Sequence, residues 1–260
     1  FELPTGELWS PKNYTGDFYG PSTLRRGIEQ SRNAMTVRLA DDMGIGKLKE
    51  FTERLGIYDE MPRVLAMALG AGETTLLRMT TAYSVIANGG KRIEPTLIDR
   101  IQDRYGRTVY RHDGRECPSC RAEAWENQPE PEIFDDRDEV INPYTAYQIT
   151  SMLEGVVERG TGKVLQKVGK PVAGKTGTTN EVRDSWFIGF TPDLTVGVYV
   201  GYDTPEPMGR EATGGQLAAP VVAEFMREAL REVAATPFRV LASRSKAAPS
   251  GRRRRTSTTS

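Results

Sequence analysis

Three stretches rich in β-forming residues lie close together in the last third of the chain, and they constrain the fold more than any other feature. They span 172–178, 185–190 and 195–201, and only TNEVRD and TPDL separate them. A parallel crossover needs about a dozen residues or more, so connections this short allow only antiparallel pairing of neighbouring strands. We therefore expect an antiparallel sheet.

Helical patterns precede these strands. Apolar residues at helical spacing predict helices on both sides of a break near Ser31. Thr74 is placed to cap a further helix, which should end at the strong stop signal of 88–90. Asn142 and Pro143 form a good helix start, and the helix that they open should end at the following Gly-Thr-Gly.

A last helix is predicted over about 220–234, and residues 96–111 indicate a hairpin that turns at Tyr105 and Gly106. We expect the apolar residues of the last helix to lie in the core, namely Val221, Val222, Phe225, Met226 and Leu230. Helices, a strand meander and a closing helix together predict an α/β (α+β) sandwich in which helices cover an antiparallel sheet.

Length and composition are those of a soluble globular domain. The chain has 260 residues, 38% hydrophobic and 27% charged, and no apolar run reaches the roughly 18 residues of a membrane helix. It begins FELPTG, with neither an initiator Met nor a signal peptide, so we expect Phe1 to lie inside a longer protein. We predict one domain over 1–238, in which the acidic, aperiodic residues 112–139 are a surface excursion.

The C-terminal residues 239–260 differ from the rest in charge. The whole chain has 35 basic and 35 acidic residues, but this segment carries seven basic residues and no acidic one. It has few large apolar groups, so we expect a disordered basic tail rich in Ser, Thr and Arg. Contact with an anionic polymer or a membrane surface is the alternative. We expect no nucleic-acid partner.

Cys117 and Cys120 form a single C-x-x-C. A structural zinc site would need two more ligands, and His112 is the only histidine in the chain. Outside the cytosol the two cysteines could instead close a small disulfide that staples a loop. A disulfide or a plain loop is therefore favoured over metal or redox chemistry, and we expect no metal and no cofactor.

The stretch GKPVAGKTGTTN fits two incompatible patterns. From Gly169 to Thr176 it matches the phosphate loop G-x-x-x-x-G-K-[ST] of nucleotide-binding enzymes, and from Lys175 it is a K-T-G-T strand. A phosphate loop needs a helix that begins at its Lys-Thr, but Gly-Thr-Thr-Asn is a poor helix start. The nucleotide-binding interpretation is therefore the remote alternative.

A second motif favours the strand. Ser31-Arg32-Asn33 lies at the predicted helix break, upstream of K-T-G. Penicillin-binding proteins and serine β-lactamases carry S-x-x-K, S-x-N and K-T-G in that order, so two of their three motifs are present here. Capping of the next helix by Ser31 or Asn33 is the purely structural alternative.

Longer blocks extend this likeness. GELWSPKNYTGDFYGPSTLRRGIEQSRN, ALGAGETTLLRMTTAYSVIANGG, AGKTGTTNEVRDSWFIGFTPDLTVGVYVGYD and ATGGQLAAPVVAEFM occur in that order between about Gly6 and Leu230. Together they resemble the C-terminal transpeptidase domain of the class A, bifunctional penicillin-binding proteins. The resemblance implies the penicillin-binding protein and serine β-lactamase fold, and a peptidoglycan DD-transpeptidase that joins D-Ala-D-Ala stem peptides through a serine acyl-enzyme.

The resemblance also implies roles for residues of both motifs. Ser31 would relay a proton to the leaving amine, and Asn33 would hydrogen-bond the substrate backbone. Lys175 would supply positive potential, and the hydroxyls of Thr176 and Thr178 would bind the terminal carboxylate. Two backbone roles complete the set: the N–H of Thr178 would form half of the oxyanion hole, and Gly177 would let the substrate lie against the strand.

The nucleophile of the family, in S-x-x-K, has no match before Ser31. The pattern occurs once, from Ser243 to Lys246, on the wrong side of K-T-G, and we interpret it as coincidence. We expect the nucleophile, a glycosyltransferase domain and a membrane anchor to lie before Phe1, and the present chain alone to be inactive.

The resemblance further implies partners and a location. Stem peptides and lipid II-derived glycan strands would be the substrates, and β-lactams would be covalent inhibitors of the longer protein. Regulators of cell-wall synthesis are further candidate partners. The site of action would be the outer, periplasmic face of the cytoplasmic membrane.

Two alternatives share the same motifs. A serine β-lactamase needs a base that activates water, often a Glu in E-x-x-x-N, and Glu123 with Asn127 has that spacing, although both lie in the acidic excursion. A sensor domain that only binds β-lactams is the alternative without catalysis.

Overall fold

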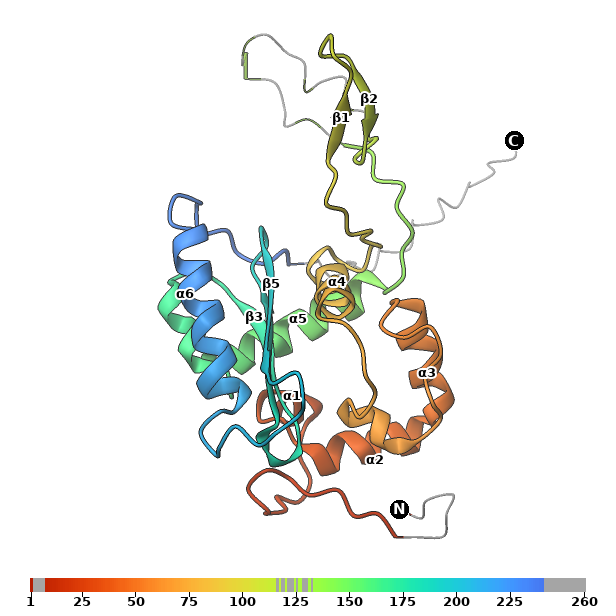
Figure 1. Cartoon of the computed structure of the whole chain (residues 1–260), viewed down its shortest axis with the longest axis vertical. Coiled ribbons are helices and arrows are strands. Elements are labelled where there is room, and N and C mark those ends of the chain that lie inside the picture. The colour runs from red at the N-terminus through yellow and green to blue at the C-terminus, as the bar shows by residue number, and fades with distance from the viewer. Residues whose placement is uncertain are drawn as a thin grey trace, which may run out of the picture.

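A three-stranded antiparallel sheet forms the centre of the molecule, as predicted (Figure 1). The computed structural model describes residues 1, 8–115, 117, 120, 124, 126–127, 131 and 133–240. The sheet has the order β3-β4-β5, so β3 and β5 are its edges. The strands are β3 (Ala173–Thr178), β4 (Asp184–Phe190) and β5 (Thr195–Gly201).

Helices cover both faces of this sheet. Figure 1 shows the sheet nearly edge on, with α6 (Ala219–Ala229) on one side, α4 (Leu76–Ala87) on the other and α5 (Pro143–Glu158) crossing behind it. Leu153 and Val156 of α5 pack with Ala173 and Phe190 on the side of α4. The α6 face buries Phe187 of β4 completely, and the opposite face does the same with Phe190. The fold is therefore the predicted sandwich of helices and an antiparallel sheet.

The starts of α4 and α5 differ in how well the sequence predicted them. Asn142 caps α5 as expected, because its side chain accepts a hydrogen bond from the N–H of Tyr144. The prediction that Thr74 caps α4 is wrong, since the cap is Thr75, which accepts from Arg78. The hydroxyl of Thr74 instead donates to the carbonyl of Ile57 at 2.6 Å.

The break near Ser31 is confirmed and has a defined geometry. It separates α1 (Leu24–Glu29) from α2 (Asn33–Met43). Ser31 has φ = 52°, in the left-handed region, and its N–H donates to the carbonyl of Ile28 while that of Arg32 donates to Gly27. These two hydrogen bonds form a Schellman motif, which ends a helix and normally has glycine at the left-handed position.

The closing helix is shorter than predicted, because α6 ends at Ala229 and not near 234. Val222, Met226 and Leu230 are buried as expected, but Val221 and Phe225 are 48% and 54% exposed. The expectation that both lie in the core is wrong: they lie on the side of α6 that faces away from the sheet. The remaining helical elements are α3 (Ile45–Arg54), η1 (Leu65–Leu69), η3 (Lys163–Val168), η4 (Asn180–Val182) and a π-helical turn, η5 (Gly214–Ala218).

The predicted hairpin is confirmed as β1 (Arg100–Gln102) and β2 (Thr108–Arg111), and it projects from the body of the molecule (Figure 1). Gly106 at its turn has φ = 82°, a conformation that glycine adopts without strain. All residues of both strands are exposed. Cys117 and Cys120 form a disulfide, one of the two favoured outcomes.

The domain boundary at 238 and the surface excursion at 112–139 remain predictions, and residues 241–260 of the predicted tail lie outside the described residues. Within the described part of the chain, no helix is long and apolar enough to cross a membrane.

Candidate functional site

The strand β3 brings the K-T-G-T residues to an edge of the sheet and divides them between its two faces. Lys175 pairs with Ile188 and Thr176 with Phe187 across β3 and β4. Successive side chains of a strand point to opposite faces. Lys175 therefore lies on the face that α4 and α5 cover, and Thr176 lies on the α6 face.

On the first face, Lys175 meets the other predicted motif. Its Nζ donates to Oγ of Ser31 at 2.7 Å and to the carbonyl of Thr176 at 2.9 Å. Ser31 and Lys175 are 144 positions apart in the sequence. Burial lowers the pKa of the Lys175 ammonium to about 8, because desolvation disfavours its charged form. The two motifs thus form a serine–lysine pair whose lysine loses its proton more readily than an exposed lysine does.

On the α6 face, the two threonine hydroxyls meet residues outside the motif. Thr176 and Thr161 place their Oγ1 atoms 2.8 Å apart, and either can be the donor. Oγ1 of Thr178 accepts a hydrogen bond from the N–H of Gly214 at 2.9 Å. Because this bond uses a lone pair, the Thr178 proton can still be donated toward a carboxylate.

At this end of β3, η5 and β4 lie so close to the strand that two of the positions in contact are glycine. A Cβ on Gly214 would collide with the carbonyl oxygens of Gly177 and Trp186. A Cβ on Gly177 would lie 3.0 Å from Cβ of Trp186, tighter than normal contact. A side chain at Gly177 would thus require Trp186 to shift slightly, and the predicted contact of Gly177 with substrate remains a prediction.

Asn33 is a predicted site residue whose side chain makes its contact away from Lys175. Its side chain donates to the carbonyl of Lys12 at 3.0 Å. The N–H of Ala34, next in α2, donates to Oδ1 of Asn13 at 3.2 Å. The N-cap of α2 is Arg32, without a side-chain capping bond, so neither Ser31 nor Asn33 caps α2. The capping alternative is wrong.

Sequence reasoning missed three contributors to this arrangement: Asn13, Thr161 and Gly214. Thr161 was noted only as part of the Gly-Thr-Gly stop signal, and Gly214 only as part of the block ATGGQLAAPVVAEFM. The Gly-Thr-Gly and Thr-Gly-Gly patterns were the available signals, because a threonine or a backbone N–H flanked by glycine can approach another strand closely.

The phosphate-loop alternative fails on geometry. Lys175 and Thr176 lie inside β3, and Gly169 ends η3 with φ = 72°, so no helix begins at Lys-Thr. The candidate base of the β-lactamase alternative, Glu123, lies outside the described residues. The same holds for the coincidental S-x-x-K from Ser243 to Lys246. Among the residues that are described, no cluster of His, Cys, Asp and Glu could hold a metal ion.

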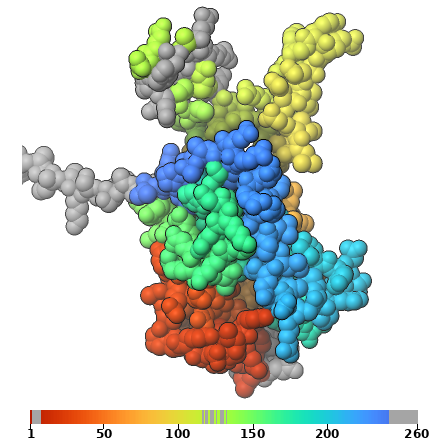
Figure 2. Space-filling model, turned by 90° about the vertical axis from the view of Figure 1, so that its left-hand side faces the viewer, coloured from red at the N-terminus to blue at the C-terminus, as the bar shows by residue number. Residues whose placement is uncertain are grey.

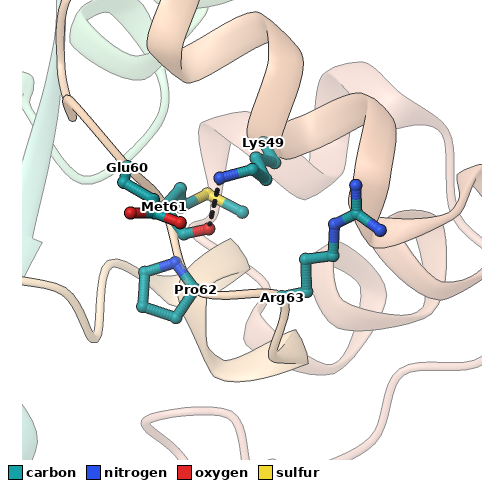
Figure 3. Close-up of a pocket in the computed structure, with 5 residues that line it drawn as sticks. All are labelled: Lys49, Glu60, Met61, Pro62 and Arg63. Carbon is teal, nitrogen blue, oxygen red and sulfur yellow. Dashed lines mark hydrogen bonds between the residues drawn. The ribbon is translucent and has the colours of Figure 1, made fainter.

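A cavity of about 520 Å³ lies elsewhere, against α3, and is lined by Lys49, Glu60, Met61, Pro62 and Arg63 (Figure 3). Lys49 donates to the carbonyl of Met61 at 3.3 Å, as the dashed line in Figure 3 marks, and pairs with Glu53 at 2.6 Å. The bond from Lys49 to Met61 ties α3 to the segment after it. None of the predicted site residues lines this cavity.

Comparison with known proteins agrees with this arrangement. Residues 3–227 match the penicillin binding protein transpeptidase domain. The chain is 47% identical over 238 residues to penicillin-binding protein 1A of Rickettsia prowazekii, and 39% identical over 235 residues to that of Neisseria gonorrhoeae. The matches cover 89% and 88% of this chain but 30% and 27% of those proteins, so the chain spans less than a third of their length.

Solved structures give the same result. Penicillin-binding protein 1A from Haemophilus influenzae is similar with a TM-score of 0.77 at 29% identity, over 95% of this chain and 39% of that one. PonA1 from Mycobacterium tuberculosis in complex with penicillin V has a TM-score of 0.72 at 20% identity, over 94% of this chain and 65% of that one, and shows the shared fold. The predicted fold class is confirmed.

Proposed function

The chain belongs to the penicillin-binding protein transpeptidase family, and we propose that, as part of a longer class A synthase, it cross-links peptidoglycan by D-Ala-D-Ala transpeptidation. The observation that carries the proposal is the hydrogen bond from Lys175 to Ser31 at 2.7 Å, on a strand whose other face presents threonine hydroxyls. Transfer of an acyl group from a peptide needs a nucleophile, a proton donor for the leaving amine and a clamp for the terminal carboxylate. We assign the proton donor to Ser31 with Lys175, and the clamp to Thr176 and Thr178.

In the proposed reaction, a serine Oγ attacks the carbonyl of the penultimate D-Ala and forms an ester, while the lysine of the proposed S-x-x-K takes the proton of that serine and passes it on to Lys175 once Lys175 has donated its own. The bond to the terminal D-Ala breaks, and its amine takes the proton of the Ser31 hydroxyl. Lys175, which donates to Ser31 Oγ, can replace that proton because desolvation lowers its pKa to about 8. Thr176 and Thr178 are the proposed ligands of the terminal carboxylate, and Asn33 is the proposed contact for the substrate backbone.

The serine nucleophile has no candidate before Ser31 in this chain, and the proposal assigns it to an S-x-x-K outside the 260 residues. The short coverage of the relatives supports this assignment. Stem peptides on glycan strands are the proposed substrates, with β-lactams as inhibitors, and the outer face of the cytoplasmic membrane is the proposed location. A disulfide between Cys117 and Cys120 is compatible with such an oxidising compartment.

Intact-mass measurement after exposure to a penicillin tests the proposal. We would compare the longer protein that carries this chain and an S-x-x-K with the present chain alone. The expected result is a mass gain of one drug molecule on the longer protein only. An adduct on the 260-residue chain would contradict the assignment of the nucleophile, and no adduct on a folded longer protein would contradict the acyl-enzyme.

The fate of the adduct separates the transpeptidase from its alternatives. A transpeptidase should hold the adduct for hours and should join stem peptides when a D-Ala-D-Ala donor and an amine acceptor are supplied. Rapid loss of the adduct by hydrolysis would indicate a β-lactamase, and a stable adduct without any cross-linked product would indicate a sensor.

A further inference from the structure

Glu29, the last residue of α1, is a nearly buried carboxylate held by Arg159, the C-cap residue of α5. Its side chain is 7% exposed. Arg159 donates to both of its oxygens, from Nε to Oε2 at 3.0 Å and from Nη2 to Oε1 at 2.6 Å. Arg25 adds a third charge contact at 3.8 Å. Two parallel hydrogen bonds fix the orientation of both side chains as well as their distance.

The surface of α5 is shaped for this contact. A Cβ on Gly155 would collide with Oε1 of Glu29, and a Cβ on Gly160 would collide with the carbonyl oxygen of Glu29. The N–H of Thr161 donates to that same carbonyl at 3.3 Å. Gln30 also bonds the carbonyl of Arg159 at 3.3 Å. In Figure 2 the red N-terminal segment and the green segment after α5 meet on one side of the molecule.

Two site residues lie two positions beyond this contact, one on each chain segment. Ser31 follows Glu29 and reaches Lys175 on one face of β3. Thr161 follows Arg159 and reaches Thr176 on the other face. The Glu29–Arg159 pair therefore sets the relative position of the two side chains that contact β3 from opposite faces.

We propose that Glu29 and Arg159 are positioning residues for the transpeptidase reaction, because their ion pair holds Ser31 on Lys175 and Thr161 on Thr176. Neither reaches Lys175 or Thr176, so both act through their neighbours. The inference rests on the proposed function. A shift of about 1 Å at a reacting group can cost about 100-fold in rate, so a loosened pair should slow acylation even in a folded protein.

The test uses the longer protein that carries this chain and its S-x-x-K. The variants are Glu29→Gln, Arg159→Gln and their combination, with Arg159→Lys as a milder change that keeps the charge but loses the paired hydrogen bonds. Arg137→Gln is the matched control, because Arg137 makes the same two-bond contact to Asp135, at 2.8 and 2.9 Å, away from the site. The readouts are the second-order rate of acylation by penicillin and the thermal unfolding temperature.

We expect each Gln variant to lower the acylation rate about 10- to 100-fold at temperatures where it is folded. The double variant should be no slower than either single one, because both changes break one contact. The acylation rate of Arg159→Lys should lie between those of the Gln variants and that of the unmodified protein. Arg137→Gln should acylate within about twofold of the unmodified protein. In a Ser31→Ala background, Glu29→Gln should cause a much smaller further loss.

Four outcomes would overturn the inference. Unchanged acylation in the folded Gln variants would show that the pair serves stability alone, and so would a loss in Arg159→Lys that only follows its unfolding temperature. An equal loss from Glu29→Gln with and without Ser31 would show that Glu29 does not act through Ser31. If the unmodified longer protein does not acylate at all, the proposed function fails and this inference fails with it.

Discussion

The two faces of β3 carry different polar chemistry, and they are built in different ways. On one face, covered by α4 and α5, Lys175 is half-buried and its ammonium is desolvated against Ser31. On the other, hydroxyl and N–H groups of Thr161 and Gly214 meet uncharged threonines. A buried charge costs stability, whereas hydroxyl pairs near the surface cost little. The comparison indicates that the polar groups of the first face lower the stability of the fold, whereas those of the second face change it little.

Replacing the charge should have the largest effect. In the longer protein, we expect Lys175→Met to lower penicillin acylation by about 10²- to 10⁴-fold, because the proton supply to Ser31 is lost. The same change should leave the protein as stable or more stable, because methionine fills the space without a desolvated charge. Rates and denaturation midpoints measure both effects. Lys47→Met, on an exposed part of α3, is the control, and a destabilised Lys175→Met protein would contradict the comparison.

A methyl group on the opposite face should act only on packing. Gly214→Ala places Cβ against two backbone carbonyl oxygens, which cannot rotate away, so we expect a loss of roughly 1–3 kcal/mol in unfolding free energy. Gly46→Ala in α3 is the control, since its Cβ would meet no atom within 4 Å. Chemical denaturation of the two variants tests this. Equal stability of both would mean that the close approach at Gly214 is not needed.

Titration of Lys175 should appear as a pH dependence of stability. Its pKa falls from 10.5 to about 8 on folding, so between these values the unfolded chain binds more protons than the folded one. The unfolding free energy should therefore rise with pH in this window, by about 1 kcal/mol per pH unit, and be flat below it. Burial raises the pKa of Tyr83 to about 12, which opposes the rise above pH 10, so the difference between wild type and Lys175→Met between pH 8 and 9.5 is the quantity to measure. A difference that does not change with pH would show that Lys175 is not desolvated.

The smallest effect is expected for the hydroxyl pair. Thr161→Val and Thr176→Val each remove one partner of an exposed hydrogen bond, and a double-mutant cycle should give a coupling of about 0.5 kcal/mol in unfolding free energy. A coupling above about 2 kcal/mol would mean that the hydroxyl pair stabilises the fold strongly, which would contradict the comparison of the two faces.

Local signals made part of this molecule predictable. The sheet followed from two short connections, the start of α5 from Asn142 and Pro143, and the hairpin from its glycine turn, because each depends on residues close in sequence. The family resemblance identified Ser31 and Lys175 as candidate site residues, but it did not predict the hydrogen bond between them. The cap of α4 was misplaced by one residue because Thr74 and Thr75 are equally good caps, and only the carbonyl of Ile57 selects between them.

The contacts that complete the site were not predictable from local patterns. Glu29 and Arg159 are separated by 130 residues, and Thr161 and Thr176 come together only after α5 packs along β3. Nothing near Asn13 in the sequence indicates that it bonds the start of α2. Val221 and Phe225 fit an apolar stripe, but α6 has only one face on the sheet, and helical spacing alone did not define how wide that face is.

The left-handed backbone of Ser31 has an evolutionary consequence. With φ = 52° at the end of α1, this position suits glycine, and a residue with a side chain is disfavoured there by roughly 1 kcal/mol. Substitution by glycine would relieve that strain and remove the hydroxyl on Lys175 in a single step. Selection for stability alone would therefore favour glycine here, at the loss of the hydroxyl that Lys175 contacts.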